Sequence, residues 1–193
     1  MKLLHLDASS LGQHSVSREL SAAIVDQLAR DVSSLEITYR DLTAQPLPHW
    51  TPVQDAESPA AQLGQDVLDE FKAADVIVIG APMYNFSIPS QLKAWIDRVV
   101  IAGQTFRYTE NGPQGLATGK RVIVASSRGG VYSSGPAAGL DFQENYLRAV
   151  LGFIGITDVQ FIRAEGVSIG AEHKVKAIAS ARDSIGSVVT KAA

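Results

Sequence analysis

Short apolar runs alternate along the chain with longer stretches in which apolar residues recur every three or four positions. Val76–Ile79 is continuously apolar and β-branched, which is typical of a strand that is covered on both faces. Ser17–Arg30 instead carries Leu20, Ile24 and Leu28 at helical spacing. The two patterns predict strands and helices that follow one another in turn.

Ten such elements are predicted. The strands are expected at Lys2–Leu6, Leu35–Arg40, Val76–Ile79, Arg121–Ser126 and Val159–Ala164. The helices are expected at Ser17–Arg30, Ala60–Ala73, Ser90–Val100, Leu140–Ile154 and Ala171–Lys191. A helix between each pair of strands predicts an α/β fold, with a parallel sheet and helices on both faces. Leu35–Arg40 alternates like a half-buried strand, and no repeat or linker divides residues 1–193, which we expect to form a single domain.

Composition and charge narrow the class of protein. The 193 residues are 46% hydrophobic and 19% charged, which is the balance of an ordinary globular domain. The net charge of −3 leaves no basic patch of the kind that nucleic acid needs. No apolar run approaches the length of a membrane span, and His5 and Asp7 interrupt the N-terminal apolar stretch. We therefore expect a cytoplasmic protein that binds neither nucleic acid nor a membrane.

Several kinds of catalytic site find no support. The chain has no cysteine, which excludes thiolate nucleophiles and Cys-ligated metals. The histidines lack metal-ligand spacing; they are His5, His14, His49 and His173. Gly166–Gly170 (GVSIG) matches a nucleophile elbow, which requires an acid and then a histidine later in the chain. Only His173 follows it, and Asp183 comes after that histidine, so we interpret GVSIG as a turn and expect neither a metal nor a triad.

The connection after the first predicted strand is rich in serine. Ligands of a parallel sheet bind beyond the carboxyl ends of its strands. Ser10, Ser15 and Ser17 all lie near the start of the following helix, where hydroxyls and free N–H groups form an anion site. Capping of the helix would explain only one of these serines. No glycine-rich diphosphate motif is present, so a single phosphate held by hydroxyls fits this connection best.

The connection after Val76–Ile79 is long and apolar, whereas an ordinary one would be short and polar. Prolines stiffen both of its ends, and Tyr84 and Phe86 offer flat apolar faces. Met83 and Asn85 are expected to supply backbone N–H groups. Rigid walls with donors at the edge suit a planar heterocycle, although a loop that only packs on the core is the alternative.

A third connection follows Arg121–Ser126 and begins Ser127-Arg128-Gly129-Gly130. Paired glycines let a backbone approach a ligand closely. Alone they indicate only a turn, but the expected strand order places them beside the second connection.

Taken together, these connections resemble the FMN-dependent NADH-azoreductase and NADH:quinone oxidoreductase family. The resemblance extends over nearly the whole chain, including Phe106–Pro113 (FRYTENGP) and Phe153–Thr157 (FIGIT). It is specific because the serine loop, MYNF and SRGG occur together at strand ends. The family is flavodoxin-like, which implies a doubly wound, five-stranded parallel sheet of order 2-1-3-4-5.

The resemblance also implies a tightly bound FMN. Serine-loop residues would hold its phosphate, the second connection would border the isoalloxazine, and the third would line the other edge of the ring. The residues implied are Ser10, Ser15, Val16, Ser17, Met83, Tyr84, Asn85, Phe86, Ser127, Arg128, Gly129 and Gly130. No side chain is expected to be catalytic, because FMN carries the chemistry.

The implied reaction moves two electrons from NADH to quinones and cleaves aromatic azo compounds to amines, with donor and acceptor taking turns. A homodimer is also implied, with FMN near the subunit interface. Aromatic residues of the partner are expected over the ring, with Phe106 and Tyr108 as candidates, whereas Phe161 is expected in the core. The segment Gln45–Ser58 differs from relatives and is expected to shape the substrate mouth.

Two alternatives remain open. A flavodoxin-type electron carrier would have the same fold and no substrate of its own, but such carriers are usually strongly acidic and do not need the aromatic segment Thr105–Tyr108. A hydrolase, including a phosphodiesterase, would depend on the GVSIG match alone.

Overall fold

The computed structural model describes residues 1–52 and 55–190. Its strands are β1 (Lys2–Asp7), β2 (Glu36–Asp41), β3 (Val76–Pro82), β4 (Phe106–Thr109), β5 (Gly112–Gly115), β6 (Arg121–Arg128) and β7 (Asp158–Glu165). Its α-helices are α1 (Val16–Asp31), α2 (Pro59–Ala73), α3 (Ser90–Val99), α4 (Phe142–Phe153) and α5 (Ala171–Val189). Two short 3₁₀ turns are η1 (Gly12–His14) and η2 (Ala138–Leu140).

Five of the strands form one parallel sheet in the order β2-β1-β3-β6-β7. The predicted parallel sheet is confirmed. The exact order is not the predicted 2-1-3-4-5, because the hairpin β4–β5 lies in the chain between β3 and β6 and forms a sheet of its own. Sequence periodicity missed this hairpin, since each of its strands has only four residues.

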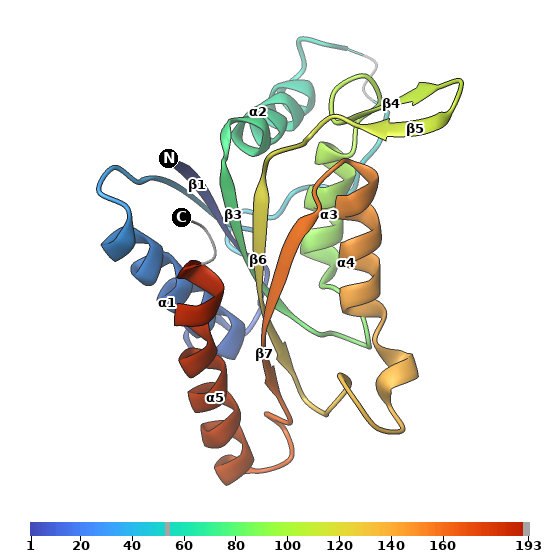
Figure 1. Ribbon diagram of the computed structural model, residues 1–193. Coiled ribbons are helices and arrows are strands. Elements are labelled where there is room, and N and C mark those ends of the chain that lie inside the picture. The colour runs from blue at the N-terminus through green and yellow to red at the C-terminus, as the bar shows by residue number, and fades with distance from the viewer. Residues whose placement is uncertain (53–54, 191–193) are drawn as a thin grey trace.

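Helices cover both faces of the sheet, as predicted. Figure 1 shows α1 and α5 on one face and α2, α3 and α4 on the other. The first face packs around Leu20, Ile24 and Ile185, whereas the second contains the fully buried Phe71 and Trp95. The carboxyl ends of the strands all point to the same edge, and Pro82 pairs with Ser127 there. The connections after β1, β3 and β6 therefore emerge side by side.

Three element boundaries differ from the predictions in ways that matter for the site. β3 continues to Pro82 and β6 to Arg128, so both strands carry the chain further toward the ligand edge than their apolar runs indicated. The predicted helix start at Leu140 is wrong, because η2 precedes α4 and Asp141 caps it by accepting from the N–H groups of Gln143 and Glu144. The predicted end of the last helix, Lys191, lies outside the described residues.

The prediction that Leu35–Arg40 is half-buried is also wrong. β2 begins at Glu36 and is exposed over most of its length. Ile37 and Tyr39, which belong to the apolar positions of the alternation, are 47% and 53% exposed. Within the part of the chain that the structure describes, β2 pairs with β1 alone, so it lies at the edge of the sheet with most of its side chains exposed.

Candidate functional site

The serine loop ends in the N-terminus of α1. Ser15 is the N-cap, and its Oγ accepts from the Arg18 N–H at 3.3 Å and lies 3.1 Å from the Ser17 Oγ. Both serines are buried. The N–H groups of Val16 and Ser17 have no acceptor among the described residues. Two hydroxyls and two free amides at a helix N-terminus form a neutral anion site.

Arg18 fixes this loop but does not offer a free charge to an anion. Its guanidinium makes a bidentate pair with Asp41, with Nη1 and Nη2 donating at 2.6 and 2.8 Å. Nη2 also donates to the Ser9 carbonyl at 2.8 Å. The hydrogen bond from Arg18 holds the pKa of Asp41 well below its usual range. The charge of Arg18 is therefore neutralised by Asp41. The hydroxyls and free N–H groups of the serine loop are left to bind the ligand.

Asp7 lies beneath the loop in the same polar cluster. Its carboxylate accepts from Ser21 Oγ at 2.8 Å and from the Tyr39 hydroxyl at 3.1 Å. Burial, followed by the charge of Asp7, raises the pKa of Tyr39 to about 12. Gly80 on β3 faces this carboxylate, and a Cβ there would collide with it. A glycine is needed at residue 80 because Asp7 occupies the space that its side chain would fill.

The loop after β3 is a tight turn that the sequence did not reveal. Tyr84 N–H donates to the Ser87 carbonyl at 2.9 Å, and Ser87 N–H donates back at 3.0 Å. The two residues between them, Asn85 and Phe86, have φ values of 49° and 70°. Two consecutive left-handed residues are typical of the type I′ hairpin turn, which usually has glycine or asparagine there. Phe86 in this conformation is strained, and such strain occurs most often at ligand-binding sites.

This turn decides which amides can meet a ligand. The sequence led us to expect a free N–H at Met83. This N–H instead donates to the Ser127 carbonyl at 2.8 Å and is not available to a ligand. The N–H groups of Asn85 and Phe86 have no acceptor in the described part of the chain. The backbone donors that MYNF offers to a ligand therefore belong to its last two residues, Asn85 and Phe86.

Tyr84 joins the turn to the serine loop. Its hydroxyl lies 2.9 Å from Ser10 Oγ and accepts from the Ser10 N–H at 3.1 Å. Burial opposes ionisation of the phenol, but the hydrogen bonds from Ser10 and Ser9 outweigh burial and lower the pKa of Tyr84. The first two connections thus form one continuous surface.

The third connection presents its backbone in the same way. The carbonyls of Arg128, Gly129 and Gly130 accept from the turn after β7, and the N–H groups of both glycines have no acceptor among the described residues. The Tyr132 ring packs edge-to-face on Phe86, with ring centroids 6.0 Å apart. The Arg128 side chain, in contrast, is fully buried in ion pairs with acidic residues and does not face the other loops.

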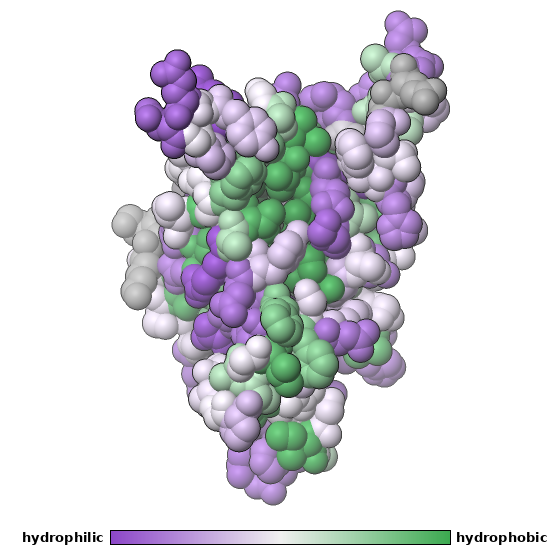
Figure 2. Space-filling model, turned by 90° about the vertical axis from the view of Figure 1, so that its right-hand side faces the viewer, coloured by the Kyte–Doolittle hydropathy of each residue, from purple (hydrophilic) through white to green (hydrophobic). Residues whose placement is uncertain are grey.

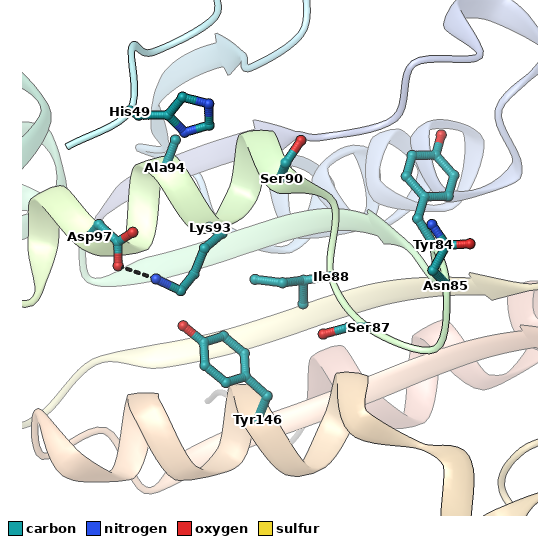
Figure 3. A pocket seen from close by; sticks show the side chains of 10 residues that line it. All are labelled: His49, Tyr84, Asn85, Ser87, Ile88, Ser90, Lys93, Ala94, Asp97 and Tyr146. Carbon is teal, nitrogen blue, oxygen red and sulfur yellow. Dashed lines mark hydrogen bonds and ion pairs between the residues drawn. The ribbon is translucent and has the colours of Figure 1, made fainter.

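A groove of about 550 Å³ opens beside these loops, between α3 and α4 (Figure 3). Lys93 and Asp97 on α3 form an ion pair at 2.5 Å, and the Tyr146 hydroxyl on α4 points toward them. His49 reaches the groove from the proline-rich segment. Sequence reasoning missed these residues, because they come from three elements and none belongs to a motif. The proposed substrate mouth at Gln45–Ser58 contributes to the groove through His49, whereas residues 53 and 54 lie outside the described part.

GVSIG is the turn that supports the third connection. The Ser168 N–H donates to the Gly129 carbonyl at 3.1 Å, and Gly166 has a φ of 74° that completes the turn. Ser168 Oγ has no hydrogen bond to a histidine or a carboxylate within residues 1–52 and 55–190. This arrangement gives the serine no general base, and the turn has a structural role.

Comparisons with known proteins agree with this geometry. A sequence profile of the flavodoxin-like fold matches residues 1–189. The chain is 58% identical to an FMN-dependent NADH:quinone oxidoreductase of Sinorhizobium fredii, over 96% of this chain and 95% of that one. It is 59% identical to FMN-dependent NADH:quinone oxidoreductase 2 of Bradyrhizobium diazoefficiens, over 94% and 95% of the two chains. Among solved structures, an FMN-dependent NADH-azoreductase of Bacillus anthracis in complex with FMN matches with a TM-score of 0.89 and 26% identity, over 100% of this chain and 99% of that one.

Proposed function

The chain belongs to the flavodoxin-like family of FMN-dependent NADH:quinone oxidoreductases and azoreductases, and on this basis we propose that it transfers two electrons from NADH to quinones and reductively cleaves azo compounds. When bound, FMN supplies this chemistry by accepting electrons from NADH and passing them to the second substrate. The protein binds and orients the flavin, and no side chain need act as an acid, base or nucleophile.

The observation that carries this proposal is the set of free backbone donors at one edge of the sheet. They lie on all three connections, and they belong to Val16, Ser17, Asn85, Phe86, Gly129 and Gly130. Neutral donors at the start of α1 suit a monoester phosphate, and donors beside aromatic side chains suit the polar edge of an isoalloxazine. The donor set therefore fits FMN, and all six residues are among those that the family resemblance implied for the cofactor.

We assign the phosphate to Ser10 and the start of α1, with Ser15 and Ser17 as hydroxyl donors. Tyr84 and Phe86 would border the ring, together with Met83 and Asn85. The third connection would line the other edge through the backbone of Ser127, Gly129 and Gly130. Arg128 would contribute through its backbone alone, because its guanidinium is engaged elsewhere.

A homodimer is the second part of the proposal. α4 exposes apolar residues at Phe142, Ala149 and Phe153, with the half-buried Tyr146 between them, a spacing that suits packing against another helix. Figure 2 shows hydrophobic surface running down the middle of the face that carries α3 and α4. A two-fold symmetric contact between two such faces would bury this surface. Each subunit would then cover the ligand site of its partner in the same way.

The hairpin β4–β5 supplies the aromatic group that a partner could bring. Phe106 is buried against Phe153 and Tyr108, whereas Tyr108 itself is 75% exposed. The hairpin lies at the end of the sheet opposite the ligand edge of its own chain (Figure 1), and we propose that its exposed tyrosine serves the site of a second copy. Phe161 packs in the core, as expected from the sequence.

Two further expectations stay part of the proposal. Residues 1–193 would act as one domain, and the protein would work in the cytoplasm. Within the described residues, none of the helices has the length and apolarity to cross a membrane.

Steady-state kinetics test the proposed activity. With NADH and a quinone varied together, we expect parallel double-reciprocal lines, because one pocket beside the ring would hold the two substrates in turn. Intersecting lines would argue for separate sites. Absence of quinone-dependent NADH oxidation in a flavin-loaded protein would favour the electron carrier instead.

A further inference from the structure

Glu165, the last residue of β7, lies against the third connection but belongs to none of the sequence motifs. Its Oε1 accepts from the N–H groups of Tyr132 and Ser133 at 2.8 and 2.9 Å. Its Oε2 accepts from Ser133 Oγ, and Oε1 also accepts from Arg128 Nη1 at 3.2 Å. One carboxylate thus holds both ends of the chain segment that contains Gly129 and Gly130.

The residues after Glu165 hold the middle of the same segment. The N–H groups of Gly166, Val167 and Ser168 donate to the carbonyls of Gly130, Arg128 and Gly129 at 2.9 to 3.1 Å. All three carbonyls are therefore turned toward the β7–α5 turn. The amides of the two glycines consequently face away from it and are left without an acceptor in the described structure.

Glu165 also belongs to a buried network of ion pairs that is centred on Arg128. The Arg128 guanidinium has no exposed surface, and it also donates to Asp141 at 2.9 Å and to Glu144 at 2.6 Å. Glu144 is shared with Arg163. Buried ion pairs add little net stability compared with apolar packing, but they fix the positions of the groups that they join. Here they join β6, α4 and β7 under the third connection.

Glu165 also places an aromatic wall of the site. The Tyr132 ring lies directly over Gly130, where an added Cβ would approach its Cε2 to 3.2 Å. The same ring packs against Phe86, which belongs to the second connection. Fixing the Tyr132 backbone therefore aligns the third connection with the strained turn.

We propose that Glu165 is a positioning residue for the flavin: its carboxylate holds Arg128, Tyr132 and Ser133 so that the amides of Gly129 and Gly130 point at the ring edge. This inference rests on the proposed FMN binding. Without the carboxylate, the carbonyls of Arg128, Gly129 and Gly130 keep their hydrogen bonds to the β7–α5 turn. The N–H groups of Tyr132 and Ser133 lose their acceptor. The Tyr132 ring and the end of the segment after Gly130 then have to be ordered by the ligand itself, which weakens binding.

The test compares Glu165→Ala with Glu165→Gln in the full chain. Fluorescence titration of the apoprotein with FMN is expected to show at least a tenfold weaker affinity for Glu165→Ala. Glu165→Gln can still accept from both amides and donate to Ser133 Oγ, so we expect less than a threefold loss. Glu172→Ala removes a carboxylate whose only ion pair within the described residues is an exposed one to Lys176, and its affinity should equal that of wild type.

Thermal unfolding of each apoprotein separates positioning from general stability. A purely structural role would lower the unfolding temperature of Glu165→Ala without changing its FMN affinity, and that result would overturn the inference. So would a glutamine variant as weak as the alanine variant. If Glu165→Ala does not fold, Ser133→Ala decides: an unchanged affinity would overturn the inference, and a severalfold loss would support it. Failure of wild type to bind FMN would instead refute the proposed function.

Discussion

Tyr84 and Ser87 are hydrogen-bonded to each other in both directions, and this pair forces Asn85 and Phe86 into the left-handed region. The turn leaves the amides of Asn85 and Phe86 without acceptors, and it sets Phe86 against Tyr132. Backbone strain is thus located where the isoalloxazine is proposed to bind.

Substitutions of Asn85 measure this strain, because its side chain is exposed and makes no hydrogen bond with the described residues. Asn85→Gly should leave the free energy of unfolding within about 0.5 kcal/mol of wild type, since glycine accepts a positive φ. Asn85→Val should lower it by about 1–3 kcal/mol, since a β-branched residue resists that conformation. Urea unfolding of the apoproteins gives both values. Equal stabilities would show that the turn does not constrain residue 85.

The phosphate assignment predicts the effect of replacing Ser15 and Ser17 together. A hydrogen bond to a charged group contributes about 1.5–3 kcal/mol, so the double alanine variant should bind FMN more weakly by a few kcal/mol at most. The free amides of Val16 and Ser17 would remain. Fluorescence titration measures the affinity. Loss of the Ser15 cap should also destabilise α1 by about 1 kcal/mol. An unchanged affinity for FMN would place the phosphate elsewhere.

The Arg18–Asp41 pair predicts a pH-dependent stability. The pKa of Asp41 is lower in the folded protein than in the unfolded chain, chiefly because Arg18 donates to it. Its ionised form therefore stabilises the fold above the unfolded pKa of about 4, and this contribution is lost as the pH falls further. Asp41→Asn should lower the free energy of unfolding by about 2 kcal/mol at neutral pH. The difference from wild type should shrink in acid, and a constant difference at every pH would contradict this explanation.

How far the sequence predicts this molecule depends on whether a feature is local. The buried strands and the donor-bearing residues are local: β3 is apolar throughout, and Val16, Asn85 and Gly129 stand in short motifs at strand ends. Features that depend on tertiary contacts were not predictable. The Met83 N–H donates to the Ser127 carbonyl on another strand. The Arg128 side chain turns inward because Glu144 of α4 and Glu165 of β7 lie beside it.

The groove and the positioning carboxylate show the same limit. Tyr146 and Lys93 meet only because α3 and α4 pack on the same face of the sheet. Glu165 lies 33 residues after the amide of Tyr132 that it binds. Neither pairing leaves a periodic signal in the sequence.

The proposed dimer predicts that Tyr108 matters for substrate and not for the flavin. Tyr108→Ala removes a largely exposed side chain, so FMN affinity and stability should change little. The KM for a quinone should rise severalfold, because one wall of the pocket would be lost. Arg107→Ala on the same hairpin is a control at an adjacent exposed position. Sedimentation equilibrium at the assay concentration completes the test, and a fully active monomer would contradict a shared pocket.

The central claim is that three loops of neutral donors bind FMN for reduction by NADH. The most direct measurement is the visible spectrum of the protein purified with the flavin that it carries, titrated anaerobically with NADH and then with a quinone. We predict one FMN per chain, bleaching of the flavin absorption by stoichiometric NADH, and its full return on addition of the quinone. Extraction of FAD as the main bound flavin, or a spectrum that NADH leaves unchanged, would contradict the claim.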